Sequence, residues 1–301
     1  MANLKEIRNR INSVKSTQKV TSAMKMVAAA KLKRAQDRIV ALRPYALKLQ
    51  EIIGNVVSVV DVEDIPSRLV EQREVKNILA IVVTSNRGLA GPFNANIIKH
   101  ANQFLQEHHD AEMKAGNVQF VCIGRKGYEF FKKRGYNVND QNFDVFTDLS
   151  FDKVDAVNDL IFEKFLSGEV DKVYLMFNEF KNVMSQIRHA DNLLPLAVSE
   201  LEEQQASAEA QDSMASDYIY EPNREDILTD LIPKSVRIQV FRAVLESNAA
   251  EHGARMVAMD AATENAEDLL RNLRISYNKA RQASITKEIL EIAAGADALE
   301  N

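Results

Sequence analysis

The chain has 301 residues, of which 46% are hydrophobic, and this size suits two folded domains with a sizeable core rather than a disordered or fibrous chain. Its ten glycines and six prolines are about half the usual frequency, which predicts few turns and long helices. The single cysteine, Cys122, excludes an internal disulfide. No apolar run reaches the roughly 18 residues of a membrane span and Met1 opens no signal peptide, so we expect a soluble chain.

Charge is distributed unevenly within the net value of -5. Residues 1–50 carry 12 lysines and arginines against two acidic residues, whereas residues 51–224 carry 17 against 28. A basic segment on an acidic body predicts that the segment meets an anionic partner. That partner could be nucleic acid, lipid head groups or an acidic protein surface.

The N-terminal segment predicts one long helix, since residues 1–53 contain no glycine and only one proline, Pro44, where a kink could form. From Leu4 to Val60, apolar residues recur alternately three and four positions apart, which is typical of a coiled-coil seam. The three polar exceptions, Gln18, Thr21 and Lys25, are consecutive in the seam. They indicate that this stretch faces something other than a single apolar partner helix.

The C-terminal segment repeats the pattern. Residues 235–294 contain only Gly253 and no proline, which predicts a second helix of about 60 residues, roughly 90 Å long at 1.5 Å per residue. Ile285, Ile289 and Ile292 continue a seam by steps of four and three. Two long helices of equal length at opposite ends of the chain most simply pair antiparallel, each burying its apolar stripe on the other.

Between these helices the pattern changes to short apolar runs. Residues 78–84, 119–123 and 172–177 read as buried strands, separated by helical stretches near residues 94–108, 126–134 and 152–166. This alternation predicts a doubly wound, Rossmann-like α/β domain inserted into an antiparallel two-helix coiled coil. The predicted organisation is a coiled-coil helix at 1–65, an α/β domain at 74–198, a flexible polar insertion at 199–216, a short strand at 217–222 and a coiled-coil helix at 225–301.

One glycine-rich turn, from Thr84 to Pro92, could cradle a phosphate, because it follows a strand and precedes a helix. It matches neither established phosphate-binding pattern, and Pro92 removes one amide donor, so we favour a turn that structures the sheet. An enzyme that binds a dinucleotide in the α/β domain remains the alternative, and equilibrium dialysis against nucleotides discriminates the two.

No other group of residues predicts chemistry. His108, His109 and Glu112 lack metal-ligand spacing, because adjacent histidines on a helix point about 100° apart, and a solvated helix end is the simpler interpretation. We expect no catalytic, cofactor or metal site. The basic helix could contact nucleic acid, but an acidic protein groove or a solvated coiled-coil flank explains its charges as well. A salt-dependent gel shift of a random nucleic-acid duplex would support the nucleic-acid interpretation.

Long runs at both ends of the chain resemble one family. They are LKEIRNRI and TQKVTSAMKMVAAAK, starting at Leu4 and Thr17, and ARMVAMDAATEN and YNKARQASIT, starting at Ala254 and Tyr277. These runs, with SNRGLAGPFN and YIYEP in the middle, strongly resemble the gamma subunit of rotary F-type ATP synthases of the bacterial type. The resemblance covers nearly the whole chain except the polar insertion after Ser199 and the variable helices of the central domain.

The resemblance implies a central rotor shaft that couples proton-driven rotation of a membrane ring to ATP synthesis and hydrolysis. Its partners would be three alpha and three beta subunits, the epsilon subunit and the ring of c subunits. The chain itself would be non-catalytic, with no cofactor and no direct small-molecule substrate, and would lie peripherally on the cytoplasmic side of the bacterial inner membrane.

The resemblance also assigns contact residues. Those implied at the alpha/beta head are Met24, Lys25, Lys31, Lys33, Arg34, Arg255, Arg281, Gln282, Thr286 and Glu288. Tyr218 and Tyr220 lie two apart on the predicted strand and so share a face. They could pack on the domain's own sheet, but the resemblance favours a contact with epsilon or the membrane ring.

Overall fold

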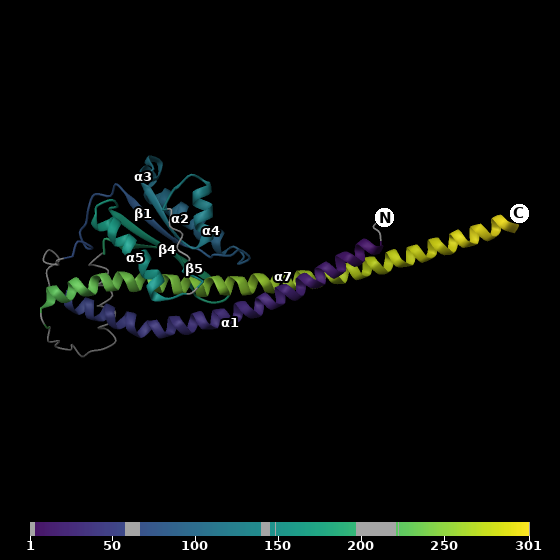
Figure 1. Cartoon of the computed structure of the whole chain (residues 1–301), viewed down its shortest axis with the longest axis horizontal. Coiled ribbons are helices and arrows are strands. Elements are labelled where there is room, and N and C mark those ends of the chain that lie inside the picture. The colour runs from purple at the N-terminus through teal and green to yellow at the C-terminus, as the bar shows by residue number, and fades with distance from the viewer. Residues whose placement is uncertain are drawn as a thin grey trace. The chain divides into compact units, whose positions relative to one another are not determined.

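The computed structural model describes residues 4–57, 67–139, 145–147, 149–196, 221 and 223–300. The chain forms two compact units, a smaller one of residues 1–29 with 255–301 and a larger one of residues 30–254. Both predicted terminal helices are present: α1 spans Leu4–Val57 and α7 spans Arg224–Glu300 (Figure 1).

The two long helices differ in length, with 54 residues in α1 and 77 in α7, so the expectation of equal helices is wrong. Helix α7 begins at Arg224, one residue before the predicted start at 225, and contains Pro233, just as α1 contains Pro44. Neither helix ends at its proline. At Pro233, burial of the adjacent Ile232 and of Val236 offsets the roughly 3 kcal/mol that a proline costs inside a helix.

A five-stranded sheet forms the centre of the larger unit, in the order β3-β2-β1-β4-β5. Its strands are β1 (Ile78–Val83), β2 (Val118–Ile123), β3 (Asn137–Val138), β4 (Lys172–Phe180) and β5 (Gln186–Leu194). The first four are parallel, and β5 runs antiparallel to β4. The three strands predicted from apolar runs are confirmed as β1, β2 and β4.

Among the described residues, four shorter helices connect the strands: α2 (Phe93–His108), α3 (Asp110–Ala115), α4 (Arg125–Lys133) and α5 (Phe151–Leu166). Three of them match the predicted stretches to within one residue at each end. The short helix α3 was not predicted, and it ends at Gly116, whose φ of 79° is a left-handed conformation that glycine adopts without strain.

The sheet has a core on each face, because successive side chains of a strand point to opposite sides. From β1, Leu79, Ile81 and Val83 face α5, α1 and α7, while Ile78, Ala80 and Val82 face α2 and α4. Figure 1 shows α2 and α4 on the far side of the sheet from α1 and α7. Burial on both faces explains why β1 is an unbroken apolar run.

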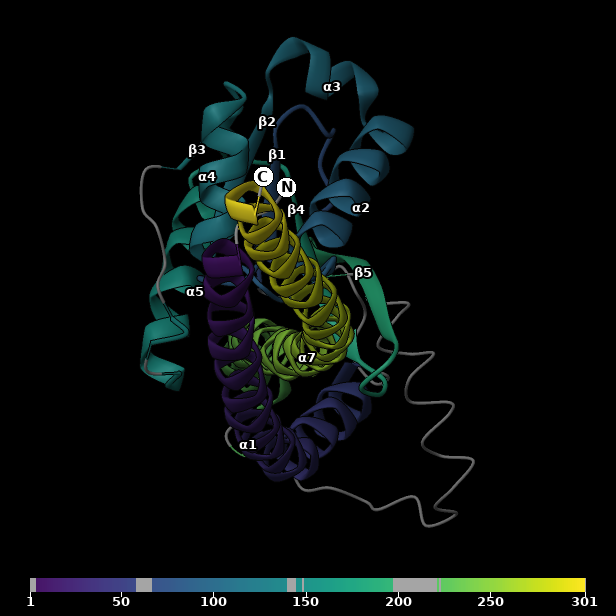
Figure 2. The same cartoon turned by 90° about the vertical axis from the view of Figure 1, so that its right-hand side faces the viewer.

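The smaller unit consists of the beginning of α1 and the end of α7, which lie side by side and antiparallel (Figure 2). The predicted pairing of the two terminal helices is therefore confirmed for this unit. The resulting fold is the predicted one, a two-helix coiled coil with an inserted parallel-sheet domain.

Candidate functional site: the paired ends of the long helices

Three polar contacts cross between α1 and α7 in the smaller unit. Gln18 Nε2 donates to Glu267 Oε1 at 2.9 Å, the hydroxyls of Thr21 and Thr263 lie 2.8 Å apart, and Lys25 Nζ donates to Asp260 Oδ1 at 2.5 Å. We call these three contacts the polar ladder. Their residue numbers rise on one helix as they fall on the other, which fixes the antiparallel register of the pair.

The middle contact of the ladder is the most buried, since Thr21 is only 9% exposed. Each hydroxyl also lies near a carbonyl of its own helix, Thr21 Oγ1 at 3.0 Å from Gln18 O and Thr263 Oγ1 at 2.7 Å from Met259 O. Two hydroxyl hydrogens cannot serve three such bonds. One threonine therefore donates across the interface while the other donates to its own helix.

The ladder explains the polar interruption of the α1 seam. Gln18, Thr21 and Lys25 do face the partner helix, but the residues opposite them are polar and complementary rather than apolar. A signal for this pairing is present in the sequence, because polar residues on α7 occur at 260, 263 and 267 with the same steps of three and four. The pattern of α1 alone does not reveal the pairing, because the polar partners lie on the other helix.

The predicted apolar stripe at the end of α7 is not buried within this chain. Ile285, Ile289 and Ile292 are 48%, 60% and 73% exposed. The expectation that this stripe packs on α1 is wrong, because the register of the ladder places Leu4, where α1 begins, opposite about residue 281 of α7. Residues 285–292 of α7 thus present apolar side chains without a facing helix among the described residues.

The residues predicted to contact the head fall on both units. In the smaller unit, Met24, Lys25 and Arg255 are half-buried, and the exposed ones are Arg281, Gln282, Thr286 and Glu288. In the larger unit, Lys31, Lys33 and Arg34 are exposed on α1, where Lys33 pairs with Asp37 at 2.9 Å. Tyr218 and Tyr220 lie outside the described residues.

The glycine-rich turn after β1 makes hydrogen bonds of its own. Asn94 Oδ1 accepts the Ser85 backbone N–H at 2.9 Å, and Asn86 Oδ1 accepts the Arg125 N–H at 3.1 Å, which joins the ends of β1 and β2. Ala90 and Phe93 pack against α7. These contacts agree with a turn that structures the sheet.

The histidine pair at the end of α2 differs from the predicted solvated helix end. His109 has a side chain only 12% exposed, and its Nε2 lies 2.7 Å from the hydroxyl of Tyr174 on β4. Burial lowers the pKa of His109, although Glu112 acts in the opposite direction. His108, in contrast, is exposed and stacks on Phe104. The prediction is therefore wrong for His109, since a residue distant in sequence covers it.

Comparison with known proteins identifies the family. Residues 3–299 match the family model described as ATP synthase. The ATP synthase gamma chain of Cytophaga hutchinsonii is 48% identical over 301 residues, covering all of both chains, and that of Chloroherpeton thalassium is 51% identical over 302 residues, covering 100% of this chain and 99% of the relative. The chain belongs to the ATP synthase gamma-chain family.

Solved structures agree on the fold. A chain from the rotor of the Euglena gracilis mitochondrial ATP synthase is 19% identical with a TM-score of 0.58, covering 94% of this chain and 98% of that one. A chain from the OSCP/F1/c-ring structure of the same organism is 20% identical with a TM-score of 0.64, covering 98% and 94%. At these identities the likeness bears on the fold alone.

Among the described residues, no helix is long and apolar enough to cross a membrane. Within the same residues, no cluster of three histidine, cysteine or carboxylate side chains is arranged to hold a metal ion.

Proposed function

We propose that this chain is the central rotor shaft of a bacterial F-type ATP synthase, which couples proton-driven rotation of a membrane ring to ATP synthesis and hydrolysis in a head of three alpha and three beta subunits. The observation that carries the proposal is the two-helix coil of a gamma-family chain. Its paired part has a fixed register, and its α7 end exposes apolar side chains that a surrounding partner can cover.

The coil supports torque transmission by its construction. A pair of packed helices resists bending and twisting more than one helix does, and the polar ladder, with Thr21 buried at its middle, opposes sliding of one helix along the other, because sliding would leave its polar groups without partners. Rotation applied at the larger unit would then reach the end of α7 without being lost as slippage.

The head contacts follow the family assignment. The half-buried Met24, Lys25 and Arg255 and the exposed Arg281, Gln282, Thr286 and Glu288 would meet the alpha and beta subunits, with Lys31, Lys33 and Arg34 facing acidic loops of beta. Charge without close hydrogen bonding suits a contact that must slide. The chain would supply no catalytic group, and ATP chemistry would remain with the head.

The inserted domain would form the foot of the shaft, on epsilon and the c-subunit ring, with Tyr218 and Tyr220 at that contact. The complex would hold the chain peripherally on the cytoplasmic side of the inner membrane. Crosslinking from cysteines introduced at positions 218 and 220 tests the foot separately. Products with alpha or beta alone would contradict that placement.

Rotation itself can be observed in a complex of this chain with its alpha and beta subunits. Cys122 is buried, so a cysteine introduced as Lys133→Cys, on the exposed side of α4, carries the only accessible thiol for a bead. We expect ATP to drive stepwise, unidirectional rotation of the bead. Normal ATP hydrolysis with a stationary bead in every correctly assembled complex would contradict the proposed function.

A further inference from the structure

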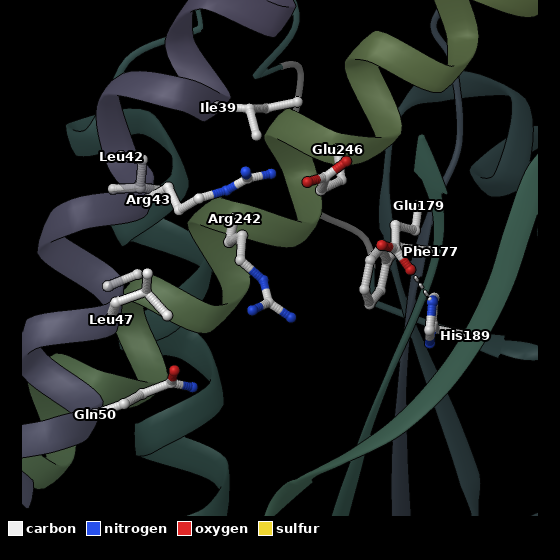
Figure 3. Close-up of a pocket in the computed structure, with 11 residues that line it drawn as sticks. Ile39, Leu42, Arg43, Leu47, Gln50, Phe177, Glu179, His189, Arg242 and Glu246 are labelled. Carbon is white, nitrogen blue, oxygen red and sulfur yellow. Dashed lines mark hydrogen bonds and ion pairs between the residues drawn. The ribbon is translucent and has the colours of Figure 1, made fainter. Parts of the chain in front are cut away.

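A cavity of about 230 Å³ lies within the larger unit, where α1, α7 and the β4–β5 pair meet. Figure 3 shows side chains from all three parts turned toward this space. None of the residues lining it belongs to the predicted head or foot contacts.

One wall of the cavity is apolar. Helix α1 contributes Ile39, Leu42, Ala46 and Leu47, and β4 contributes the ring of Phe177. This wall can cover a short hydrocarbon body, whose burial is favourable by about 25 cal/mol per Å² of surface.

The other wall is charged, and its two carboxylates already have partners. Glu179 Oε2 lies 2.6 Å from His189 Nε2, and Glu246 Oε2 accepts the backbone N–H of Phe180 at 3.2 Å. Burial raises the pKa of the Glu246 carboxyl, although the Phe180 amide and the two neighbouring arginines oppose this shift.

The two cations of the same wall, Arg43 and Arg242, are exposed side chains that act on Glu246 through their charge alone. Within the part of the chain that the structure describes, the guanidinium groups of Arg43 on α1 and Arg242 on α7 form no hydrogen bond or ion pair, yet both line the cavity (Figure 3). Each guanidinium has five N–H donors and no acceptor. The ten N–H donors of the two arginines thus outnumber the five acceptor oxygens of Glu179, Glu246 and Gln50, beside an apolar wall.

We propose that this cavity binds a small organic anion, with a carboxylate or phosphate head on Arg43 and Arg242 and a short apolar body against α1 and Phe177. Arginine suits both head groups, because its planar fork matches their paired oxygens. An anion held this way would join α1 to α7 through one ligand. The proposal is independent of the rotor function, since it rests on the larger unit alone.

Titration of the full chain with hexanoate, followed by ligand-observed NMR, tests the proposal. We expect saturable binding with a dissociation constant of about 1 mM, as befits a ligand of this size. Neutral 1-hexanol and inorganic phosphate, which each lack one half of the ligand, should both bind at least about tenfold more weakly.

Two kinds of variant locate the binding. Arg43→Gln with Arg242→Gln removes the cations, and Ala46→Leu fills the space while keeping a good helix former. Each should weaken hexanoate binding at least about tenfold. The matched control, Arg271→Gln with Arg274→Gln, removes two exposed arginines of α7 that do not line the cavity, and should bind as the wild type does.

The outcomes are decisive once circular dichroism shows that every variant is folded. A wild-type chain that shows no saturable binding overturns the proposal, as does unchanged affinity in both cavity variants. Phosphate binding as tightly as hexanoate would overturn the apolar half of the site. Equal loss of binding in the control variant would assign the effect to general charge rather than to the cavity, and would also refute it.

Discussion

The polar ladder gives a prediction that can be measured as a free energy. Thr21→Val and Thr263→Val each remove one hydroxyl while keeping the shape of the side chain. Each single substitution removes the cross-helix bond and leaves the remaining hydroxyl bonded only to its own helix, in a contact whose α1 side is only 9% exposed. We therefore expect each to destabilise the pair by about 1 kcal/mol, the usual net value of one hydrogen bond.

The double variant should behave differently. With both hydroxyls gone, no buried polar atom lacks its partner, and two valines pack as an apolar seam pair, which is nearly neutral or stabilising. The coupling energy between the two sites should thus be about 2 kcal/mol, well above the roughly 0.3–0.5 kcal/mol scatter of independent sites.

Hydrogen exchange at the amides of residues 18–25 in the full chain is the suitable assay, because it reports opening of this unit separately from the rest of the fold. Each single variant should lose about fivefold in protection and the double variant should recover most of it. Thr17→Val is the matched control, since the Thr17 hydroxyl bonds only Ser13 O of its own helix. Additive effects of Thr21→Val and Thr263→Val would refute the reasoning.

Three further predictions concern single features of the chain. Burial raises the pKa of Cys122 to about 12, so less than about one thiol in a thousand is ionised at pH 8, and the native chain should not react with a thiol reagent until denatured. Met24→Lys adds a charge at a half-buried position, and protons pumped per ATP should fall more than the rate of hydrolysis. Replacing Lys31, Lys33 and Arg34 by Gln should slow assembly with alpha and beta at low salt, and equal rates across salt would contradict this.

Much of the fold follows from periodicity. Helix α5 has a stripe with a period near 3.6 residues, and strand β1 is a short apolar run rich in β-branched residues, which its length assigns to a strand rather than a helix. Strand β5 could not be predicted in this way. Its sequence, QIRHADNLL, exposes polar residues at the edge of the sheet and becomes a strand because it pairs with β4.

The candidate site was less predictable than the fold, because it depends on register. Both seams of the coil are largely apolar, so either helix could slide by a heptad without changing the pattern. Only the complementary polar positions on the two helices, Thr21 with Thr263 and Lys25 with Asp260, select one alignment. His109 illustrates the same limit, since its partner Tyr174 is 65 residues away in the sequence.

The inserted domain also shows why a doubly wound fold need not act as an enzyme. In such folds ligands usually bind outside the carboxyl ends of the strands, where the strand order reverses, and here that place lies between β1 and β4. Helix α7 packs there through small residues: Ala250 and Ala254 meet Ala90, Phe93 and Phe180. A Cβ at Gly253 would lie 3.1 Å from the Phe180 ring, so the helix approaches as closely as a residue without a side chain permits. Helix α7 therefore occupies the position in which a Rossmann enzyme binds its nucleotide, and the inserted domain packs on the helix there.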